Sequence, residues 1–220
     1  VKFLGIVANN LDEFFEVRVA GLLQIRESGG GPTGPDGLTP DEQLKAIGRA
    51  AHAQVDAQYS CWNDDLLPAL AAEKIHLWEV DQLQGGHLAF IRRYWRGELE
   101  PILTPIVIDP AHPFPRVLNK ALCIGVLLEQ DGQTAVGVVT VPRVLPRILR
   151  LPDLDDGSVH LVTLAGIVEH QISELFEGYA VTGHGAFRVT RNGELFVNEE
   201  EADNLLEEIE ESLEKRRKGD

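Results

Sequence analysis

Two adjacent carboxamides, Asn9 and Asn10, interrupt an apolar stretch near the amino terminus of the chain. A carboxamide inside such a stretch is costly to bury unless its donors and acceptors are satisfied. Asn10 is followed three residues later by Glu13, which is the spacing of a capping box. The pattern predicts that one helix ends near Ala8 or Asn9 and another begins at Leu11, so that the break presents unpaired backbone amides to a ligand or partner. The alternative is that both side chains only cap helices, which is the usual role of Asn at such positions.

A second candidate centre is His112, which stands between two prolines and close to Asp109. The prolines stiffen the segment, and a nearby carboxylate could orient the imidazole as a nucleophile requires. A small hydrolase site at His112 and Asp109 is therefore one hypothesis, and a turn histidine bonded to backbone is the competing one. His170 follows Glu169 on a predicted helix, where neighbouring side chains point apart, so we expect a structural role for it.

Several easily recognised kinds of site are missing from the sequence. The run Gly29–Gly31 is followed by Pro32 rather than by Lys and Ser or Thr, so it does not form a Walker-type phosphate loop. No His-Glu-x-x-His, Cys-x-x-Cys or Gly-x-Ser-x-Gly motif occurs, which argues against the common metal-dependent and serine hydrolases. Cys61 and Cys123 lie in apolar surroundings without a second pair at ligand spacing, so we expect reduced thiols and a reducing cytoplasm.

The composition is that of a globular protein with an acidic surface. The chain has 220 residues, 44% of them hydrophobic, and a formal net charge of -15. No stretch is long and apolar enough to span a membrane. The negative charge argues against nucleic acid and anionic lipid as partners, because both favour a cationic surface. The chain begins at Val1 without a methionine, so we expect that residues upstream have been lost and that the sequence is a piece of a longer protein.

The first hundred residues carry the spacing of amphipathic helices. Apolar residues from Leu11 to about Glu27 recur at helical intervals. After a glycine-rich loop over 28–37, Thr39-Pro40-Asp41-Glu42 combines an N-cap, a proline in the first turn and acids near the helix start, which predicts a helix towards Leu66 with a continuation at Pro68. We expect an extended segment over 75–80 and a third helix capped by Asp81. Three antiparallel helices would then form an amino-terminal bundle over 1–100.

The character of the sequence changes after Leu99, where prolines break up a connecting segment. Runs rich in β-branched residues predict a hairpin, with strands over 121–128 and 134–141, and a further strand over 147–151. We expect a helix over 160–176, two short strands around a turn at Asn192-Gly193, and a last helix capped by Asn198 and Glu201. The basic run 215–218 at its end is expected to serve mainly as electrostatic capping. The predicted fold class is α+β, with a mixed α+β head domain over 101–220.

Five segments resemble one known family. The run from Asn9 to Leu22, Asn-Asn-Leu-Asp-Glu-Phe-Phe-Glu-Val-Arg-Val-Ala-Gly-Leu, resembles the amino-terminal signature of class-one polyphosphate kinases. The segment 103–115 resembles the motif that opens the head domain of these kinases. Segments 141–147, 175–179 and 187–192 resemble later parts of the same domain, in the family's order. One departure is Asn192-Gly193-Glu194, where the family often has acidic residues.

The resemblance implies an activity for the whole protein. Class-one polyphosphate kinases reversibly transfer the terminal phosphate of ATP to inorganic polyphosphate through a phosphohistidine, with Mg2+. In the family that histidine and most basic phosphate ligands lie in carboxy-terminal domains, so no catalytic residue is expected in this fragment, and it should be inactive alone. The basic phosphate tunnel should likewise lie in missing sequence. The family also implies a homodimer or homotetramer, to which this fragment contributes surface, and a cytoplasmic enzyme, with peripheral attachment at the inner face of the membrane as an alternative.

The resemblance also implies roles for four residues of the signature. Asn10 matches the family's contact to the adenine of ATP, and a carboxamide can donate and accept together, as an adenine edge requires. Asn9, Asp12 and Arg18 belong to the same motif, and we expect Asp12 and Arg18 to support it through orientation and salt bridges. The alternative from a different class is a non-catalytic module in which a helical part and an α+β part mediate assembly without any ligand.

Overall fold

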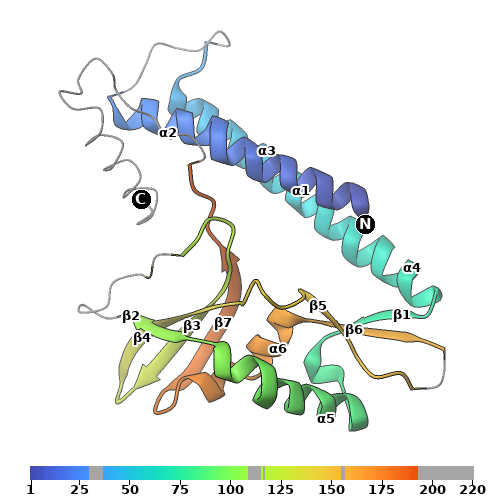
Figure 1. The fold of residues 1–220 in the computed structure, drawn as a ribbon. Helices are drawn as coiled ribbons and strands as arrows, with labels where there is room; N and C mark the ends of the chain where they lie inside the picture. The colour runs from blue at the N-terminus through green and yellow to red at the C-terminus, as the bar shows by residue number, and fades with distance from the viewer. Residues whose placement is uncertain (30–36, 109–114, 116, 155–156, 193–220) are drawn as a thin grey trace. The chain divides into compact units, whose positions relative to one another are not determined.

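The computed structural model describes residues 1–29, 37–108, 115, 117–154 and 157–192 (Figure 1). Within these residues the chain divides into two compact units. The first comprises Val1–Pro68 together with residues 190–192, and the second comprises Ala69–Val189. The two units are described separately below. The predicted domain boundary near residue 100 stays a prediction.

The described part of the first unit is a hairpin of two long helical segments. Helix α1 (Lys2–Phe14) continues through a π-helical turn (Phe15–Val19) into α2 (Ala20–Glu27). Helix α3 (Pro40–Ser60) returns antiparallel to them, contacts α2 and continues through a second π-helical turn (Cys61–Leu66) (Figure 1).

The predicted helix break at Asn9 and Asn10 is wrong, because α1 runs through both residues. The reason lies in the apolar spacing. Leu4, Leu11 and Phe15 are half-buried on one face of the segment, and their spacing continues across the two asparagines without an offset. A residue pair three apart, such as Asn10 and Glu13, also fits the interior of a helix when the apolar face does not change.

The start of α3 is confirmed as the sequence predicted it. The Thr39 hydroxyl accepts a hydrogen bond from the Glu42 backbone N–H at 3.3 Å, and a Glu42 carboxylate oxygen accepts one from the Thr39 backbone N–H at 2.9 Å. Pro40 occupies the first turn. Hydrogen bonds from the backbone and the side chain of Thr39 hold the pKa of Glu42 below its ordinary value. Burial opposes this shift to a smaller extent, and the charge of Lys45 adds slightly to it.

Helix α4 (Leu67–Ala72) continues the second segment across the boundary between the units. In the residues that the structure describes, the second unit then contains two sheets and two further α-helices. Its elements after α4, in chain order, are β1 (Ile75–Trp78), a 3-10 turn (Val80–Gln82), α5 (Gly85–Tyr94), a π-helical turn (Trp95–Leu99), a 3-10 turn (Glu100–Ile102), β2 (Pro105–Ile108), β3 (Leu122–Gln130), β4 (Gln133–Thr140), β5 (Ile148–Arg150), β6 (Val159–Thr163), α6 (Leu164–His170), a 3-10 turn (Ile172–Leu175) and β7 (Ala180–Arg188).

The two sheets have different topologies. In the three-stranded sheet, of order β1-β6-β5, β1 pairs parallel with β6, and β5 pairs antiparallel with β6. The four-stranded sheet, of order β2-β4-β3-β7, is antiparallel throughout. The predicted hairpin is β3–β4, and the predicted strand near 147–151 is β5 of the other sheet. The α+β class is confirmed.

Two predicted helices of this unit differ from the structure. The helix expected over 160–176 is partly wrong, since 159–163 form strand β6 and the α-helix is limited to Leu164–His170. Tertiary pairing with β1 overrides the local pattern there. The third predicted helix begins at Gly85, after Gln84, rather than at Asp81, and it belongs to the second unit.

The core of the second unit joins both sheets to α5 and α6. Ile91, Trp95 and Leu99 are fully buried along one face of the α5 segment. They belong to one cluster with the inward face of β3 and with α6. Gly137 on β4 is required by this packing, because an added Cβ would lie 2.6 Å from the ring of Phe176.

Several predicted features lie outside the described residues. These are most of the glycine-rich loop, the pair His112 and Asp109, the Asn192-Gly193 turn beyond its first residue, the strand expected over 195–197, and the last helix with its basic run 215–218.

Candidate functional site

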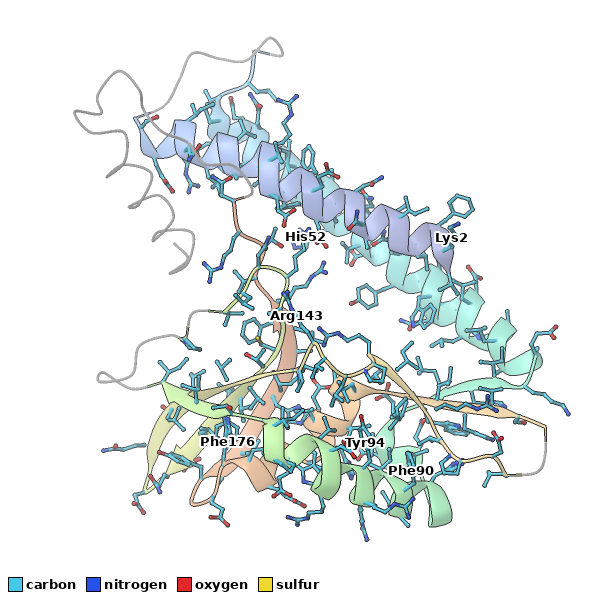
Figure 2. All side chains as sticks on the ribbon, viewed as in Figure 1. Lys2, His52, Phe90, Tyr94, Arg143 and Phe176 are labelled. Atoms are coloured by element: carbon cyan, nitrogen blue, oxygen red, sulfur yellow. The ribbon has the colours of Figure 1, made fainter. Side chains whose placement is uncertain are left out.

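The predicted nucleotide contact, Asn10, lies on the exposed face of α1. Asn9 is exposed beside it, Asp12 is half-buried, and Arg18 is exposed on the π-helical turn that follows. The four residues are therefore set along one continuous helical segment rather than at a helix restart. Its α-helical part begins at Lys2, which Figure 2 labels.

Large apolar side chains surround Asn10 on this face. Ile6 precedes it by four residues and Phe14 follows it by four, so both are its neighbours along the helix surface. Phe3 lies one turn further towards the amino terminus. The side chains of Phe3, Ile6 and Phe14 are 81%, 44% and 39% exposed. A carboxamide set between apolar side chains can hydrogen-bond the edge of a flat ring while the ring covers its apolar neighbours.

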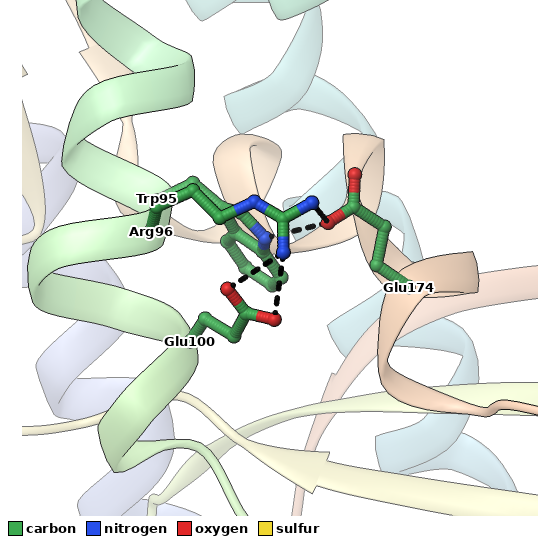
Figure 3. Close-up of polar contacts among 4 residues, drawn as sticks. All are labelled: Trp95, Arg96, Glu100 and Glu174. Atoms are coloured by element: carbon green, nitrogen blue, oxygen red, sulfur yellow. Dashed lines mark hydrogen bonds and ion pairs between the residues drawn. The ribbon is translucent and has the colours of Figure 1, made fainter.

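A polar network in the second unit was not predicted from the sequence (Figure 3). One oxygen of Glu174 accepts a hydrogen bond from the Trp95 indole N–H and forms an ion pair with Arg96, each at 3.0 Å. Arg96 also donates to both oxygens of Glu100 at 3.1 Å. The contacts fix the π-helical turn against the segment 172–175. Because two carboxylates contact one guanidinium, negative charge is in excess and the arrangement does not suit an anionic ligand. The spacing of Arg96 and Glu100 is visible in the sequence, but the distant partner Glu174 is not.

Three histidines and a tryptophan form a cluster of rings in the same unit, in which His76, Trp78 and His160 are stacked and His87 is tilted against His160. The ring centroids of His76 and His160 are 5.5 Å apart, and those of His87 and His160 are 4.9 Å apart. The Trp78 indole N–H donates to Nδ1 of His160 at 2.9 Å. Since an indole only donates, Nδ1 of His160 accepts this bond and is occupied by it. His87 donates through Nε2 to the Pro152 carbonyl at 2.8 Å. The cluster therefore holds β1, β6 and α5 together.

The remaining residues considered from the sequence, His170, Cys61 and Cys123, lie in surroundings that suit a structural role. His170 bonds through Nδ1 to the Asp81 carboxylate at 2.6 Å, so the expected helix cap at Asp81 instead joins α6 to the segment 80–82. Cys61 and Cys123 are free thiols. Burial raises the pKa of Cys123, against smaller lowering effects of the Thr140 hydrogen bond and the Arg143 charge.

The described residues offer neither a metal site nor a membrane-spanning helix. No group of three or more His, Cys, Asp and Glu side chains in this part of the chain is arranged to hold a metal ion. None of its helices is both long and apolar enough to cross a bilayer.

A helical hairpin and an α+β unit in this order match two domains of one class of phosphotransferases. Residues 1–78 match the family model of the polyphosphate kinase N-terminal domain, and residues 87–220 match that of the polyphosphate kinase middle domain. The chain belongs to the polyphosphate kinase family.

Individual relatives agree with this assignment. The polyphosphate kinase of Burkholderia multivorans is 43% identical over 211 residues, which cover 93% of this chain and 31% of that protein. The polyphosphate kinase of Xylella fastidiosa is 42% identical over 213 residues, which cover 93% of this chain and 30% of the relative. The crystal structure of polyphosphate kinase from Porphyromonas gingivalis matches with a TM-score of 0.75 at 25% identity, over 98% of this chain and 34% of that one. The chain thus spans about a third of the length of these relatives.

Proposed function

We propose that the chain is part of a polyphosphate kinase that reversibly transfers the terminal phosphate of ATP to inorganic polyphosphate through a phosphohistidine. The observation that carries this proposal is the match of two consecutive polyphosphate kinase domains, in order, over residues 1–78 and 87–220. Since this chain spans about a third of the length of its relatives, we assign the groups that carry out phosphoryl transfer to the remainder of the protein. We accordingly name no catalytic residue here.

The role of this chain in the reaction is to position the nucleotide. Phosphoryl transfer depends on in-line geometry and on cations that neutralise the equatorial oxygens. Asn10 is proposed to hydrogen-bond the adenine edge, with Ile6 and Phe14 offering apolar surface on either side. Asn9, Asp12 and Arg18 are proposed to support α1 around this contact. A hydrogen bond to the base is made equally in the ground state and in the transition state, so it strengthens ATP binding and lowers the KM for ATP while leaving kcat little changed.

The remaining partners follow from the same proposal. ATP or ADP and polyphosphate are the substrates, and Mg2+ would neutralise the phosphate charge when bound. The described residues hold no group of three metal-binding side chains, so the ligands of Mg2+ are assigned to the remainder of the protein and to the phosphates. We further propose a homodimer or homotetramer, to which this chain contributes surface, working in the cytoplasm.

The test compares substitutions in the polypeptide that the complete gene encodes. Asn10→Ala should raise the KM for ATP about five- to tenfold with kcat little changed, which is the loss expected for one hydrogen bond to a base. The matched control is Asn63→Ala, which removes another exposed carboxamide of the same unit. An unchanged KM for ATP in Asn10→Ala would remove Asn10 from the site, although family membership would stand.

The competing hypothesis of a non-catalytic assembly module is tested by the gene itself. A downstream extension of several hundred residues with a histidine in a basic, phospholipase-D-like setting supports the enzyme. A stop codon shortly after the codon for Asp220 would support the module instead.

A further inference from the structure

A π-helical turn lies between α1 and α2 in the segment that carries Asn10. Asn10 is exposed on α1, and Arg18 is exposed within the π-helical turn Phe15–Val19. The backbone N–H of Ala20, directly after this turn, donates to the Phe15 carbonyl five residues earlier. Single π-helical turns inside α-helices occur frequently at functional sites. The position of this turn between Asn10 and α2 therefore bears on what the segment binds.

The π-helical turn changes the side of the segment on which Arg18 lies. In an uninterrupted α-helix of 3.6 residues per turn, a residue eight positions after Asn10 would lie roughly 80° away from it around the axis. A π-helical turn holds more residues than an α-helical turn, because its hydrogen bonds span five residues instead of four. One turn of each kind together holds about eight residues, so Arg18 returns to the face of Asn10. The exposure agrees, since Arg18 is exposed whereas Val17 is half-buried and Val19 is buried.

The separation of Asn10 and Arg18 along the axis suits an extended ligand. Eight residues rise roughly 12 Å along a helix. In an extended nucleoside triphosphate, the phosphates lie at a comparable distance from the edge of the base. Phe14 lies between the two polar residues, four positions from each, and its side chain is 39% exposed. The face therefore presents a carboxamide, an apolar ring and a guanidinium in order.

The guanidinium of Arg18 is available to an anion. Within the residues that the structure describes, it takes part in no hydrogen bond or ion pair, whereas Arg96 and Arg150 each contact a carboxylate. The residues three and four positions away from Arg18, which are its neighbours on a helix surface, include no acid. They are Phe14, Phe15, Gly21 and Leu22. A guanidinium has five N–H donors in a planar fork that matches phosphate oxygens.

From this arrangement we infer that Arg18 contacts the phosphates of the nucleotide whose base Asn10 holds. The inference deepens the proposed function and rests on it for the identity of the ligand. It differs from the supporting role proposed for Arg18 above, because a supporting residue acts only through Asn10, whereas a phosphate contact acts independently of it. The π-helical turn then has a specific consequence, which is to set both contacts on one face of the segment.

The test is a double-mutant cycle on the KM for ATP in the polypeptide that the complete gene encodes. Arg18→Gln should raise this KM about tenfold or more, as expected for the loss of a charge-assisted hydrogen bond. Combined with Asn10→Ala, it should raise the KM by about the product of the two single factors, because the contacts are independent. The matched control is Arg26→Gln, an exposed arginine in the last turn of α2 and roughly 24 Å along the segment from Asn10. The control should leave the KM unchanged.

The conservative variant separates charge from folding. Arg18→Lys keeps the charge and should recover a large part of the affinity for ATP. An unchanged KM in Arg18→Gln would overturn the inference. So would the absence of any further rise when Arg18→Gln is added to Asn10→Ala, because Arg18 would then act only through Asn10. An equal rise of the KM in Arg26→Gln would also overturn it, since the effect would then belong to surface charge in general.

The two proposals fail in different experiments. If the product of the complete gene lacks ATP-dependent polyphosphate synthesis, the proposed function fails, and the dissociation constant for ATP replaces the KM in the cycle. If Asn10→Ala raises the KM for ATP as expected while Arg18→Gln leaves it unchanged, only the further inference fails.

Discussion

The hairpin of α1, α2 and α3 buries few side chains, whereas the unit from Ala69 to Val189 encloses a continuous core. Among the described residues, the buried apolar residues of the hairpin are Val19, Ala20 and Pro40, and the others all belong to the second unit. The helices of the hairpin are stabilised by intrinsic helix propensity, by capping and by one row of half-buried apolar side chains. The second unit is stabilised by tight packing between its sheets and helices.

This difference agrees with the part that we propose for the hairpin. A nucleotide contact needs exposed groups on a rigid element, and α1 provides Asn10 beside exposed apolar side chains. The second unit instead encloses a large cluster of buried apolar side chains.

The largest effect is expected from a substitution in the core of the second unit. Trp95→Ala removes a fully buried ring and its hydrogen bond to Glu174, and should lower the free energy of unfolding by about 3 to 5 kcal/mol. Phe15→Ala in the hairpin removes a half-buried ring and should cost much less. Urea denaturation monitored by circular dichroism, with hydrogen exchange resolved by unit, measures both. Similar losses for the two variants would contradict the difference in packing.

A smaller effect of the same kind is expected at a glycine. Gly137→Ala places a Cβ 2.6 Å from the buried ring of Phe176, so the ring must shift, and the free energy of unfolding should fall by about 1 to 3 kcal/mol. Gly97→Ala is the matched control, because nothing lies within 4 Å of its added Cβ. Thermal unfolding of the two variants decides the comparison. A Gly137→Ala protein as stable as the control would show that the packing there is loose.

The elements that the sequence predicts correctly are those set by neighbours along the chain. The start of α3 follows from Thr39, Pro40 and Glu42, and the hairpin β3–β4 follows from two β-branched runs around a short turn. Strand β6 was missed because it is defined by parallel pairing with β1, far away in the sequence. The same pairing stacks His76 on His160, and no local pattern marks that contact.

The candidate sites differ in the same way. The capping pattern at Asn10 predicted a helix break, and it failed because the spacing of Asn10 and Glu13 also occurs inside an uninterrupted helix. The assignment of Asn10 to ATP binding follows only from the resemblance to a family, and it stays a prediction. The contacts of Trp95 and Arg96 with Glu174 could not be found from the sequence, because Glu174 lies far along the chain from both residues.

The smallest effect is expected at the start of α3, where the hairpin relies on capping. Thr39→Ala removes the hydroxyl that accepts a hydrogen bond from the Glu42 N–H. It should lower the free energy of unfolding by about 1 kcal/mol, mainly through fraying of the first turns of α3.

The same cap should depend on pH. Because the pKa of Glu42 is lowered in the folded hairpin, the stabilisation that Glu42 provides is present above the ordinary glutamate pKa, near 4.5, and is lost as pH falls through the lower folded value. Acidification below about pH 4.5 should therefore increase hydrogen exchange at the start of α3 in the parent chain. In Glu42→Gln this pH dependence should disappear. The second unit serves as the internal reference, and an equal loss of protection in both units on acidification would mean that the cap is not the acid-sensitive element.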